Sequence, residues 1–414
     1  MSETTVEASV VDSITKQEAR STAYLDSRLA AKDTITDADF EVPIIDLSPS
    51  FSASLEDRQA VAAQIRKACT TSGFFYIANH GVPSTTLQSI LTQAERFFQL
   101  PLATKEALHI KKSRYGFGWE PSEYTSIAGD VETKEGFNLG YEAGLDRSGG
   151  DGKYRNLDGS ADKANFWPKE EELPGFFDGV AEYYGAVSYP SQGMLFRNHR
   201  SLLLRDIKIG DGELTYIYQV LDLARHLFRL FALSLDLPED HFDSMTTHPG
   251  GISRLLYYPA PKNPQPTEPN SSPSDEEVGL GAHSDYECFT LLLSSTTPGL
   301  EILKPSGRWH VAKHVPDAFI VNVADFLMRW TNDLYKSTIH RVVNRSNQAR
   351  YSVPFFFSIN YEEVVETLPT CLKEGEKPKY APIGAGEYVL ERLNATTKDG
   401  AGFYGNADVF AESK

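Results

Sequence analysis

Two histidines and one aspartate have the residue types and the spacing of a metal site. His283 and Asp285 are separated by one residue in GAHSDYECFTLLL, residues 281 to 293, and the apolar run that follows predicts a β-strand. Side chains two positions apart on a strand leave the same face, so these two groups can bind one ion. His340, in KSTIHRVVN, is the candidate third ligand. Two imidazoles and one carboxylate leave three adjacent positions of an octahedral ion open, which suits Fe(II) in oxygen chemistry better than structural zinc.

A His-x-Asp pair alone is a weak indication, because it also occurs as a surface pair or within a hydrogen-bond network. A second pair lies ten residues beyond His340, where ARYSVPFFF places Arg350 and Ser352 on one face of a strand. Arginine offers a rigid fork to a carboxylate, and a serine hydroxyl adds a donor beside it. The pattern predicts a dicarboxylate cosubstrate, chelated to the metal at one end and clamped by this second pair at the other.

Four segments together carry a family resemblance: YYPAP, GAHSDYECFTLL, DFLMRWTNDLYKSTIHRV and RYSVPFFF. In this order they resemble the Fe(II)/2-oxoglutarate-dependent oxygenases of the isopenicillin N synthase-like family, fungal type, over residues 42 to 393. The resemblance implies that the catalytic iron ligands are His283, Asp285 and His340. It also implies that the residues binding the distal 2-oxoglutarate carboxylate are Arg350, Ser352 and Tyr258. Many relatives carry Asn where Leu256 stands, which leaves open how the proximal end of the cosubstrate is held.

The activity that the resemblance implies is that of a non-haem Fe(II)/2-oxoglutarate-dependent dioxygenase. Such an enzyme uses Fe(II), 2-oxoglutarate and O2, with ascorbate as a supporting reductant, and oxidises a small molecule by hydroxylation, desaturation or ring formation. Secondary metabolism or catabolism is the expected setting. Two alternatives stay open: an iron oxidase of the same fold that does not use 2-oxoglutarate, as in isopenicillin N synthase or aminocyclopropane-carboxylate oxidase, and a non-catalytic metal-binding jelly roll.

Substrate contacts are expected from two groups of residues. Residues 111 to 168 hold many Gly, Tyr and Trp residues and read as long loops, which often form binding sites or lids. The candidates from this region are Arg114, Tyr115, Phe117 and Phe137. An apolar wall near the iron is expected from Phe289, Phe355 and Phe357. The competing interpretation is ordinary loop packing for the first group and core packing for the second.

Composition limits the class of partner. The chain has 414 residues, of which 41% are hydrophobic and 11% aromatic, enough to fill a sizeable core. Its 57 acidic and 40 basic side chains give a formal net charge of −17. An acidic chain without a basic stripe argues against nucleic acid or an anionic membrane as a partner. We therefore expect a small-molecule substrate, and composition does not predict an oligomeric state.

The compartment is expected to be the cytoplasm. The three cysteines, Cys69, Cys288 and Cys371, are widely separated and have no metal-binding spacing, which is typical of a reducing compartment. The N-terminal MSETTVEASVVDS lacks a basic region followed by an apolar run, so no signal peptide is expected. No apolar run is long enough to cross a bilayer.

The expected fold is mainly β with flanking helices, around a distorted double-stranded β-helix, or jelly roll. From residue 252 onward, short strands alternate with Pro/Gly turns, as in a jelly roll. Apolar residues at helical spacing predict helices over 55 to 73 and 84 to 100. The expected divisions are a polar extension (1–40), a helical and mixed region that packs on the barrel (41–250), the oxygenase core (251–395) and a tail (396–414).

Residues 187 to 219 form an anomaly within the helical region. If Ala186 were joined directly to Val220, the apolar positions on either side would continue in one helical register. These positions are Phe176, Val180, Tyr183, Val220, Leu223, Leu227, Leu230 and Phe231. The segment between them contains Pro, Gly and clustered basic residues that fit nothing in the family pattern. We interpret it as an insertion, and favour a translated unspliced intron over a genuine surface loop.

We expect the mature message of the source organism to lack the codons for residues 187 to 219. Val187-Ser188 can be encoded by an intron donor sequence of the form GT-x-AGT, and the codon of Gln219 can end in AG. Sequencing the spliced transcript checks this expectation. A message that retains these codons would establish the surface loop instead, with the long helix broken and the protein poorly stable.

Overall fold

The structure is a computed structural model, and its largest element is an eight-stranded sheet. It describes residues 36–113, 116–127, 130–157, 159–161, 165–185, 207–208, 214–215, 219–263, 269 and 276–394. In spatial order the large sheet contains β1 (Ile44–Asp46), β2 (Phe74–Ala78), β14 (Phe319–Val323), β11 (Phe289–Ser294), β16 (Arg350–Phe357), β9 (Gly251–Tyr258), β6 (Glu135–Gly140) and β3 (Gly118–Glu120). Four of its strands precede residue 250 and four follow it, so the expected domain limits stay a prediction.

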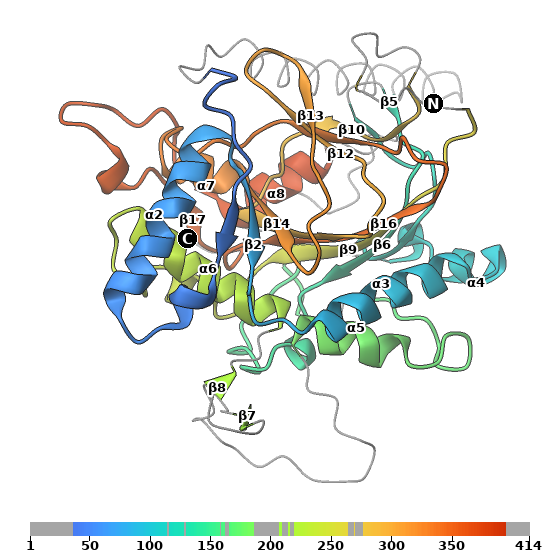
Figure 1. Cartoon of the computed structure of the whole chain (residues 1–414). Helices are drawn as coiled ribbons and strands as arrows, with labels where there is room; N and C mark the ends of the chain where they lie inside the picture. The colour runs from blue at the N-terminus through green and yellow to red at the C-terminus, as the bar shows by residue number, and fades with distance from the viewer. Residues whose placement is uncertain are drawn as a thin grey trace, which may run out of the picture.

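A smaller four-stranded sheet lies over one face of the large one (Figure 1). Its order is β10 (Val278–His283), β15 (His340–Val343), β12 (Leu300–Leu303) and β13 (Trp309–Val311). Short two-stranded pairs are β4 (Ser126–Ile127) with β5 (Asp130–Val131), β7 (Ile207–Lys208) with β8 (Leu214–Thr215), and β17 (Val364–Val365) with β18 (Ile383–Gly384). The two facing sheets agree with the jelly-roll core expected from the strand pattern.

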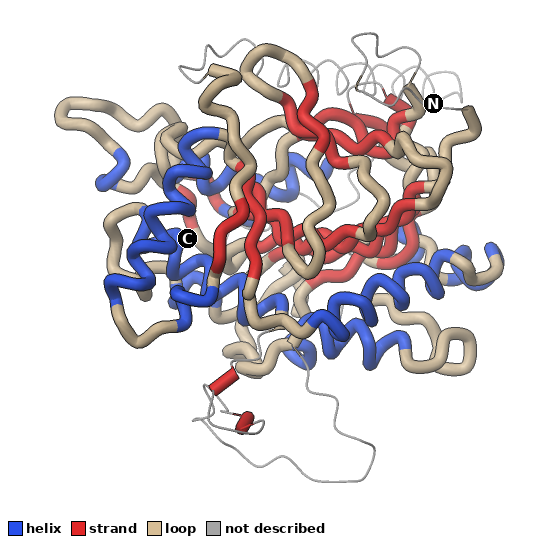
Figure 2. The backbone as a smooth tube through the Cα atoms, in the orientation of Figure 1, coloured by secondary structure: helices blue, strands red, loops and turns tan. Residues whose placement is uncertain are grey.

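Helices cover the other face of the large sheet, as Figure 2 shows for most of the helical segments. The described α-helices are α2 (Leu55–Thr71), α3 (Ser84–Phe98), α4 (Leu102–Ala107), α5 (Phe176–Tyr184), α6 (Val220–Ser234), α7 (Asp325–Trp330) and α8 (Ala385–Asn394). The last of these is an exception, since Val389 and Leu393 of α8 line the space between the two sheets. The α2 helix begins where the Ser54 hydroxyl accepts a bond from Asp57 N, and the chain leaves it through Gly73, whose φ is +70°. None of the described helices has the length and apolar character that crossing a bilayer requires.

Strand alternation decides which side chains of β16 and β9 reach the space between the sheets. The even-numbered residues Arg350, Ser352, Pro354 and Phe356 of β16 face this space, as do Ile252, Arg254, Leu256 and Tyr258 of β9. Odd-numbered residues point to the helices, where Phe357 contacts the ring of Phe228 on α6 at a centroid distance of 5.8 Å. The helix-facing side is therefore filled core, and the site lies between the sheets.

The two helices that flank residues 187–219, α5 and α6, are separate elements. All eight positions named for their common register are buried, with at most 1% exposure. Apart from β7, β8 and Gln219, residues 187–219 lie outside the described residues. The intron interpretation therefore stays a prediction.

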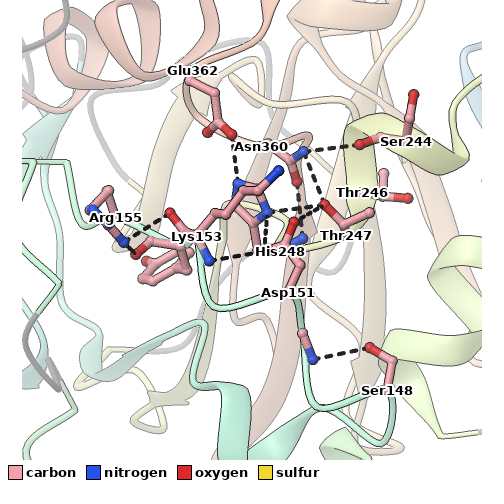
Figure 3. A network of polar contacts seen from close by, with 12 residues as sticks. Ser148, Asp151, Lys153, Arg155, Ser244, Thr246, Thr247, His248, Asn360 and Glu362 are labelled. Carbon is pink, nitrogen blue, oxygen red and sulfur yellow. Dashed lines mark hydrogen bonds and ion pairs between the residues drawn. The ribbon is translucent and has the colours of Figure 1, made fainter. Parts of the chain in front are cut away.

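A buried histidine joins the long loop after β6 to the segment that follows β16 (Figure 3). His248 is 2% exposed, and its Nδ1 lies 2.8 Å from an Asp151 carboxylate oxygen. On the opposite side of the ring, Nε2 lies 2.7 Å from a Glu362 oxygen. Its backbone N donates to the Asn360 side-chain oxygen at 3.1 Å. One imidazole thus ties three segments of the chain together.

Replacing His248 with leucine should lower the free energy of unfolding by about 1–3 kcal/mol, because buried hydrogen bonds to charged partners are lost. Urea denaturation monitored by fluorescence measures the change. The control is His314→Gln at an exposed position, which should change the unfolding free energy by less than about 0.5 kcal/mol. Equal stability of the two variants would contradict a structural role for the His248 network.

Candidate active site

The pairing of two strands brings together the three proposed metal ligands. β10 and β15 are antiparallel, and their register sets His283 directly opposite His340. The two imidazole rings lie 4.3 Å apart between centroids. Asp285 follows β10 by two residues, and one ligand atom from each of the three side chains lies within 4.8 Å of the others. Among the described residues, this is the one group of three or more His, Cys, Asp and Glu side chains whose geometry could hold a metal ion.

Backbone carbonyls orient both imidazoles. The Nδ1 of His283 lies 2.7 Å from Gly281 O, and the Nδ1 of His340 lies 3.1 Å from Thr338 O. A ring whose Nδ1 donates to a carbonyl keeps the Nε2 lone pair for a metal. Each Nε2 lies near the same oxygen, Asp285 Oδ1, at 3.5 Å from His283 and 3.6 Å from His340. The three donor atoms therefore converge on one position.

The second carboxylate oxygen of Asp285 is held by neighbouring strands. Its Oδ2 accepts bonds from the Thr290 hydroxyl on β11 and, at 2.7 Å, from the Asn322 amide on β14. Burial by itself would raise the pKa of Asp285, but the nearby imidazoles and the Thr290 bond outweigh it and hold the pKa below its ordinary value. Burial, followed by the proximity of His283, lowers the pKa of His340 to about 4. Metal binding needs an ionised carboxylate and neutral imidazoles, so the lowered pKa values of Asp285 and His340 favour it. Burial alone would lower the pKa of His283, but Asp285 raises it, so binding at His283 has to displace a proton.

One cavity of about 150 Å³ contains the three ligands and the three predicted cosubstrate residues. Arg350 is 1% exposed, and its NH1 donates to the Ser352 hydroxyl at 3.2 Å. The guanidinium carbon lies 5.0 Å from the ring centroid of Tyr258, which faces Arg350 across the β9–β16 pair. Burial lowers the pKa of Arg350, and Tyr258 opposes this effect. Leu256 lines the cavity too, opposite Ser352.

A buried polar wall, which the sequence did not reveal, forms another side of the cavity. Lys134 is 2% exposed and contacts Glu120 at 2.6 Å and Glu132 at 2.9 Å. Arg254 contacts Glu120 at 2.8 Å. Further lining residues that sequence analysis missed are Thr125, Ile252, Tyr286, Glu287, Asn322, Pro354, Phe356, Val389 and Leu393. Strand alternation was the available signal for Phe356, since it shares the face of Arg350 and Ser352.

The expected apolar wall of Phe289, Phe355 and Phe357 is wrong. Phe355 and Phe357 are odd-numbered residues of β16 and point away from the cavity, where Phe355 contacts Tyr184 at 5.6 Å between ring centroids. Phe289 packs against Phe231 of α6 at 5.1 Å. All three are core side chains, because residues one position apart on a strand face opposite sides.

Two of the four substrate contacts expected from the aromatic-rich segment, Phe117 and Phe137, do not line the cavity. Phe137 is fully buried on β6 against Phe97, 4.3 Å away between ring centroids. Phe117 is 5% exposed and lies against Gly140, where its ring fills the space a Cβ would occupy. Both are packing residues. Arg114 and Tyr115 lie outside the described residues.

Replacing Asn322 with alanine should weaken Co(II) binding about 10-fold to 100-fold, because Asp285 loses a bond that fixes its orientation. Titration calorimetry with Co(II) as the metal measures the change. The matched control is Asn138→Ala, since Asn138 is also a buried strand asparagine but contacts Arg254 and Glu120. Equal Co(II) affinity in the two variants would show that Asn322 does not support the ligand.

Comparison with known proteins agrees with this geometry. Residues 42–170 match the model for the N-terminal part of non-haem dioxygenases in morphine synthesis, and 249–359 match that of the 2OG-Fe(II) oxygenase superfamily. An Emericella nidulans 2-oxoglutarate-Fe(II) type oxidoreductase, hxnY, is 34% identical over 358 residues, which cover 84% of this chain and 88% of that protein. An Aspergillus fumigatus 2-oxoglutarate-Fe(II) type oxidoreductase is 32% identical over 362 residues, covering 86% and 93%.

Solved structures show the same fold. A full-length Neurospora crassa protein, crystallised with alpha-KG and thymine, superposes with a TM-score of 0.65 at 22% identity, covering 87% of this chain and 98% of that one. The predicted double-stranded β-helix core is thereby confirmed. The chain therefore belongs to the 2-oxoglutarate–Fe(II) oxygenase superfamily and is an Fe(II)/2-oxoglutarate-dependent dioxygenase of fungal type.

Proposed function

We propose that His283, Asp285 and His340 hold the Fe(II) of this dioxygenase. The proposal is supported by the convergence of two Nε2 atoms and one carboxylate oxygen within 4.8 Å. Two nitrogen ligands and one oxygen ligand with positions left over are the donor set that non-haem Fe(II) oxygenases use. The two histidines come from the paired strands β10 and β15, and Asp285, two residues beyond β10, is held by its bonds to Thr290 and Asn322.

The proposed binding site for the cosubstrate depends mainly on Arg350. It is a buried cation, and no carboxylate within the described chain forms an ion pair with it. Its Nε is buried without a hydrogen-bond partner. A buried charge is costly unless it is paired, so this position fits an anionic ligand. The distal carboxylate of 2-oxoglutarate would bind there, with Ser352 and Tyr258 beside it.

When bound, Fe(II) and 2-oxoglutarate supply the activation of dioxygen, which couples decarboxylation of the cosubstrate to succinate and CO2 with oxidation of a C–H bond. The protein's own contribution is orientation and the exclusion of water. The apolar side chains of Leu256, Leu280, Leu292 and Val342 line the same cavity as the ligands and Arg350. These side chains would shield the bound cosubstrate from water.

The substrate is a small molecule, and its oxidation by hydroxylation, desaturation or ring formation belongs to the proposal. A role in secondary metabolism or catabolism and a cytoplasmic location are likewise proposed. The relatives carry the name 2-oxoglutarate-Fe(II) type oxidoreductase. The two alternatives, a same-fold oxidase without 2-oxoglutarate and a non-catalytic jelly roll, are therefore not favoured.

Replacing Arg350 with methionine should raise the dissociation constant of 2-oxoglutarate about 100-fold, because a buried ion pair worth about 3 kcal/mol is lost. Anaerobic titration of the Fe(II)-loaded protein, followed by the 2-oxoglutarate–iron charge-transfer band, measures it. Asp285→Ala should abolish the band. Arg308→Met removes the same charge from an exposed position and serves as the control. Unchanged 2-oxoglutarate affinity in the Arg350 variant would refute the assignment of this residue.

A further inference from the structure

The strand that carries His283 is irregular at the place where it presents this ligand. In the pairing of β10 with β15, Leu280 is opposite Val342 and His283 is opposite His340. Three steps along β10 thus match two steps along β15. Residues three positions apart on a regular strand face opposite sides, yet Leu280 and His283 both line the cavity. One extra residue in β10 therefore turns His283 toward the metal position, as a β-bulge does.

Gly281 lies within this bulge, and its carbonyl orients the ligand. Gly281 O accepts a bond from His283 Nδ1 at 2.7 Å, which leaves Nε2 to the metal. Glycine has the greatest backbone freedom of any residue, so this part of the chain keeps one conformation only if other groups hold it. β10 stands at the end of the strand order, and β15 is its one neighbour among the described strands of the small sheet. Further support for Gly281 has to come from outside that sheet.

The segment from Glu132 to Lys134 supplies this support along the open edge of β10. Thr133 N donates to Val278 O at 3.3 Å. Three residues further along β10, the Glu132 carboxylate accepts a bond from Gly281 N at 3.2 Å. Glu132 has 0% exposure, so the bond does not compete with bulk water. A side-chain oxygen thus satisfies the N–H group of the bulge, where a neighbouring strand would otherwise supply a carbonyl.

The other oxygen of Glu132 is held as well. Its Oε2 lies 2.9 Å from Lys134 Nζ and accepts a bond from the Thr125 hydroxyl. Lys134 Nζ in turn donates to Thr125 Oγ1 at 2.8 Å and to Glu120 at 2.6 Å. A side chain whose two oxygens are both bonded keeps one orientation, so Glu132 can hold the backbone group that it contacts.

Building on the proposed function, we propose that Glu132 is a positioning residue for the metal centre, because it fixes the bulge at Gly281 and thereby the ring of His283. Lys134 and Thr125 keep Glu132 in the orientation that this role requires. Glu132 acts through the backbone of β10 and is not itself a ligand. The role needs a hydrogen-bond acceptor at this position, and it does not need the negative charge.

The competing role for Glu132 is that of a counter-ion to Lys134 alone. Two double variants separate these roles, because both remove the ion pair and leave Glu120 paired with Arg254. The acceptor-keeping variant, Glu132→Gln with Lys134→Met, retains an amide oxygen for Gly281 N. The acceptor-free variant, Glu132→Met with Lys134→Met, has nearly the same shape and no such oxygen. Replacing a buried ion pair by side chains of similar size is often neutral for stability, so both variants should fold.

The affinity of the iron-free protein for Co(II), measured by titration calorimetry, tests the proposal. The acceptor-keeping variant should bind Co(II) within about 3-fold of the wild-type protein. The acceptor-free variant should bind about 10-fold to 100-fold more weakly, as expected when a group that orients a ligand is lost. Its Co(II) absorption bands should also change, because the ring of His283 is no longer held. Equal Co(II) affinities and spectra in the two double variants would overturn the proposal and leave Glu132 a counter-ion.

Glu135→Met is the matched control. Glu135 belongs to the same segment and contacts Lys105 at 2.6 Å and the Trp119 indole at 2.8 Å, and no bond within the described chain joins it to β10. This variant should keep its Co(II) affinity within about 3-fold even where urea denaturation shows a loss of stability. Glu132→Leu with Lys134→Met provides a second acceptor-free protein if the methionine combination does not fold.

The wild-type protein and Asp285→Ala separate this proposal from the one on which it rests. If the wild-type protein binds Co(II), Asp285→Ala does not, and the two double variants are alike, the metal site stands and the role of Glu132 is wrong. If Asp285→Ala binds Co(II) as tightly as the wild-type protein, the assignment of the metal ligands fails first.

Discussion

The register of β10 against β15 is the constraint on which the site depends. A slip of one residue on either strand would turn His283 or His340 to the outer face of the small sheet. On that outer face, Arg341 of β15 is directly opposite Glu301 of β12, and the two side chains bond at 2.8 Å. Arg345 contacts the same glutamate at 2.7 Å. Arg341 also contacts Glu276, which lies two residues before β10, at 2.8 Å. Opposite charges on facing strands favour one register, so this buried ion-pair cluster supports the register of β15 against both of its neighbours.

The polar wall of the cavity is also connected to the metal ligands. Glu132 is fully buried, and its carboxylate accepts a bond from Gly281 N at 3.2 Å. The carbonyl of the same glycine accepts the bond from His283 Nδ1. Lys134 holds Glu132 in place from the other side. The chain segment that forms the polar wall is therefore joined to a proposed metal ligand through two hydrogen bonds.

The sequence predicted those site residues that lie close to one another along the chain. Ser352 lies two residues from Arg350 on β16, so strand alternation places that pair on one face. Asp285 lies two residues from His283 but beyond the end of β10, so its position depends on the turn that follows the strand. The structure brings both pairs into one cavity. The same rule, applied two steps further along β16 from Ser352 through Pro354, would have selected Phe356 in place of Phe355. Phe355 was selected because of its residue type, without asking which face of the strand it occupies. Any Phe in an apolar strand could form a pocket wall if residue type alone is considered.

The remaining side chains of the site could not be predicted, because their neighbours are decided by strand order. Asn322 reads in AFIVNV as one polar residue within an apolar strand, and only the pairing of β14 with β11 sets it opposite Thr290, so that both reach Asp285. Tyr388 of α8 likewise reaches Asp285 through Asp325: the Tyr388 hydroxyl donates to Asp325 at 2.8 Å, and Asp325 N donates to Asp285 O at 3.0 Å. Two ligands that are close in the sequence can be recognised from a few consecutive residues. The side chains that hold those ligands in place come together only when the sheets assemble. Identifying a site from the sequence therefore depends on short-range periodicity. Explaining how its side chains are oriented depends on the order in which the strands pair.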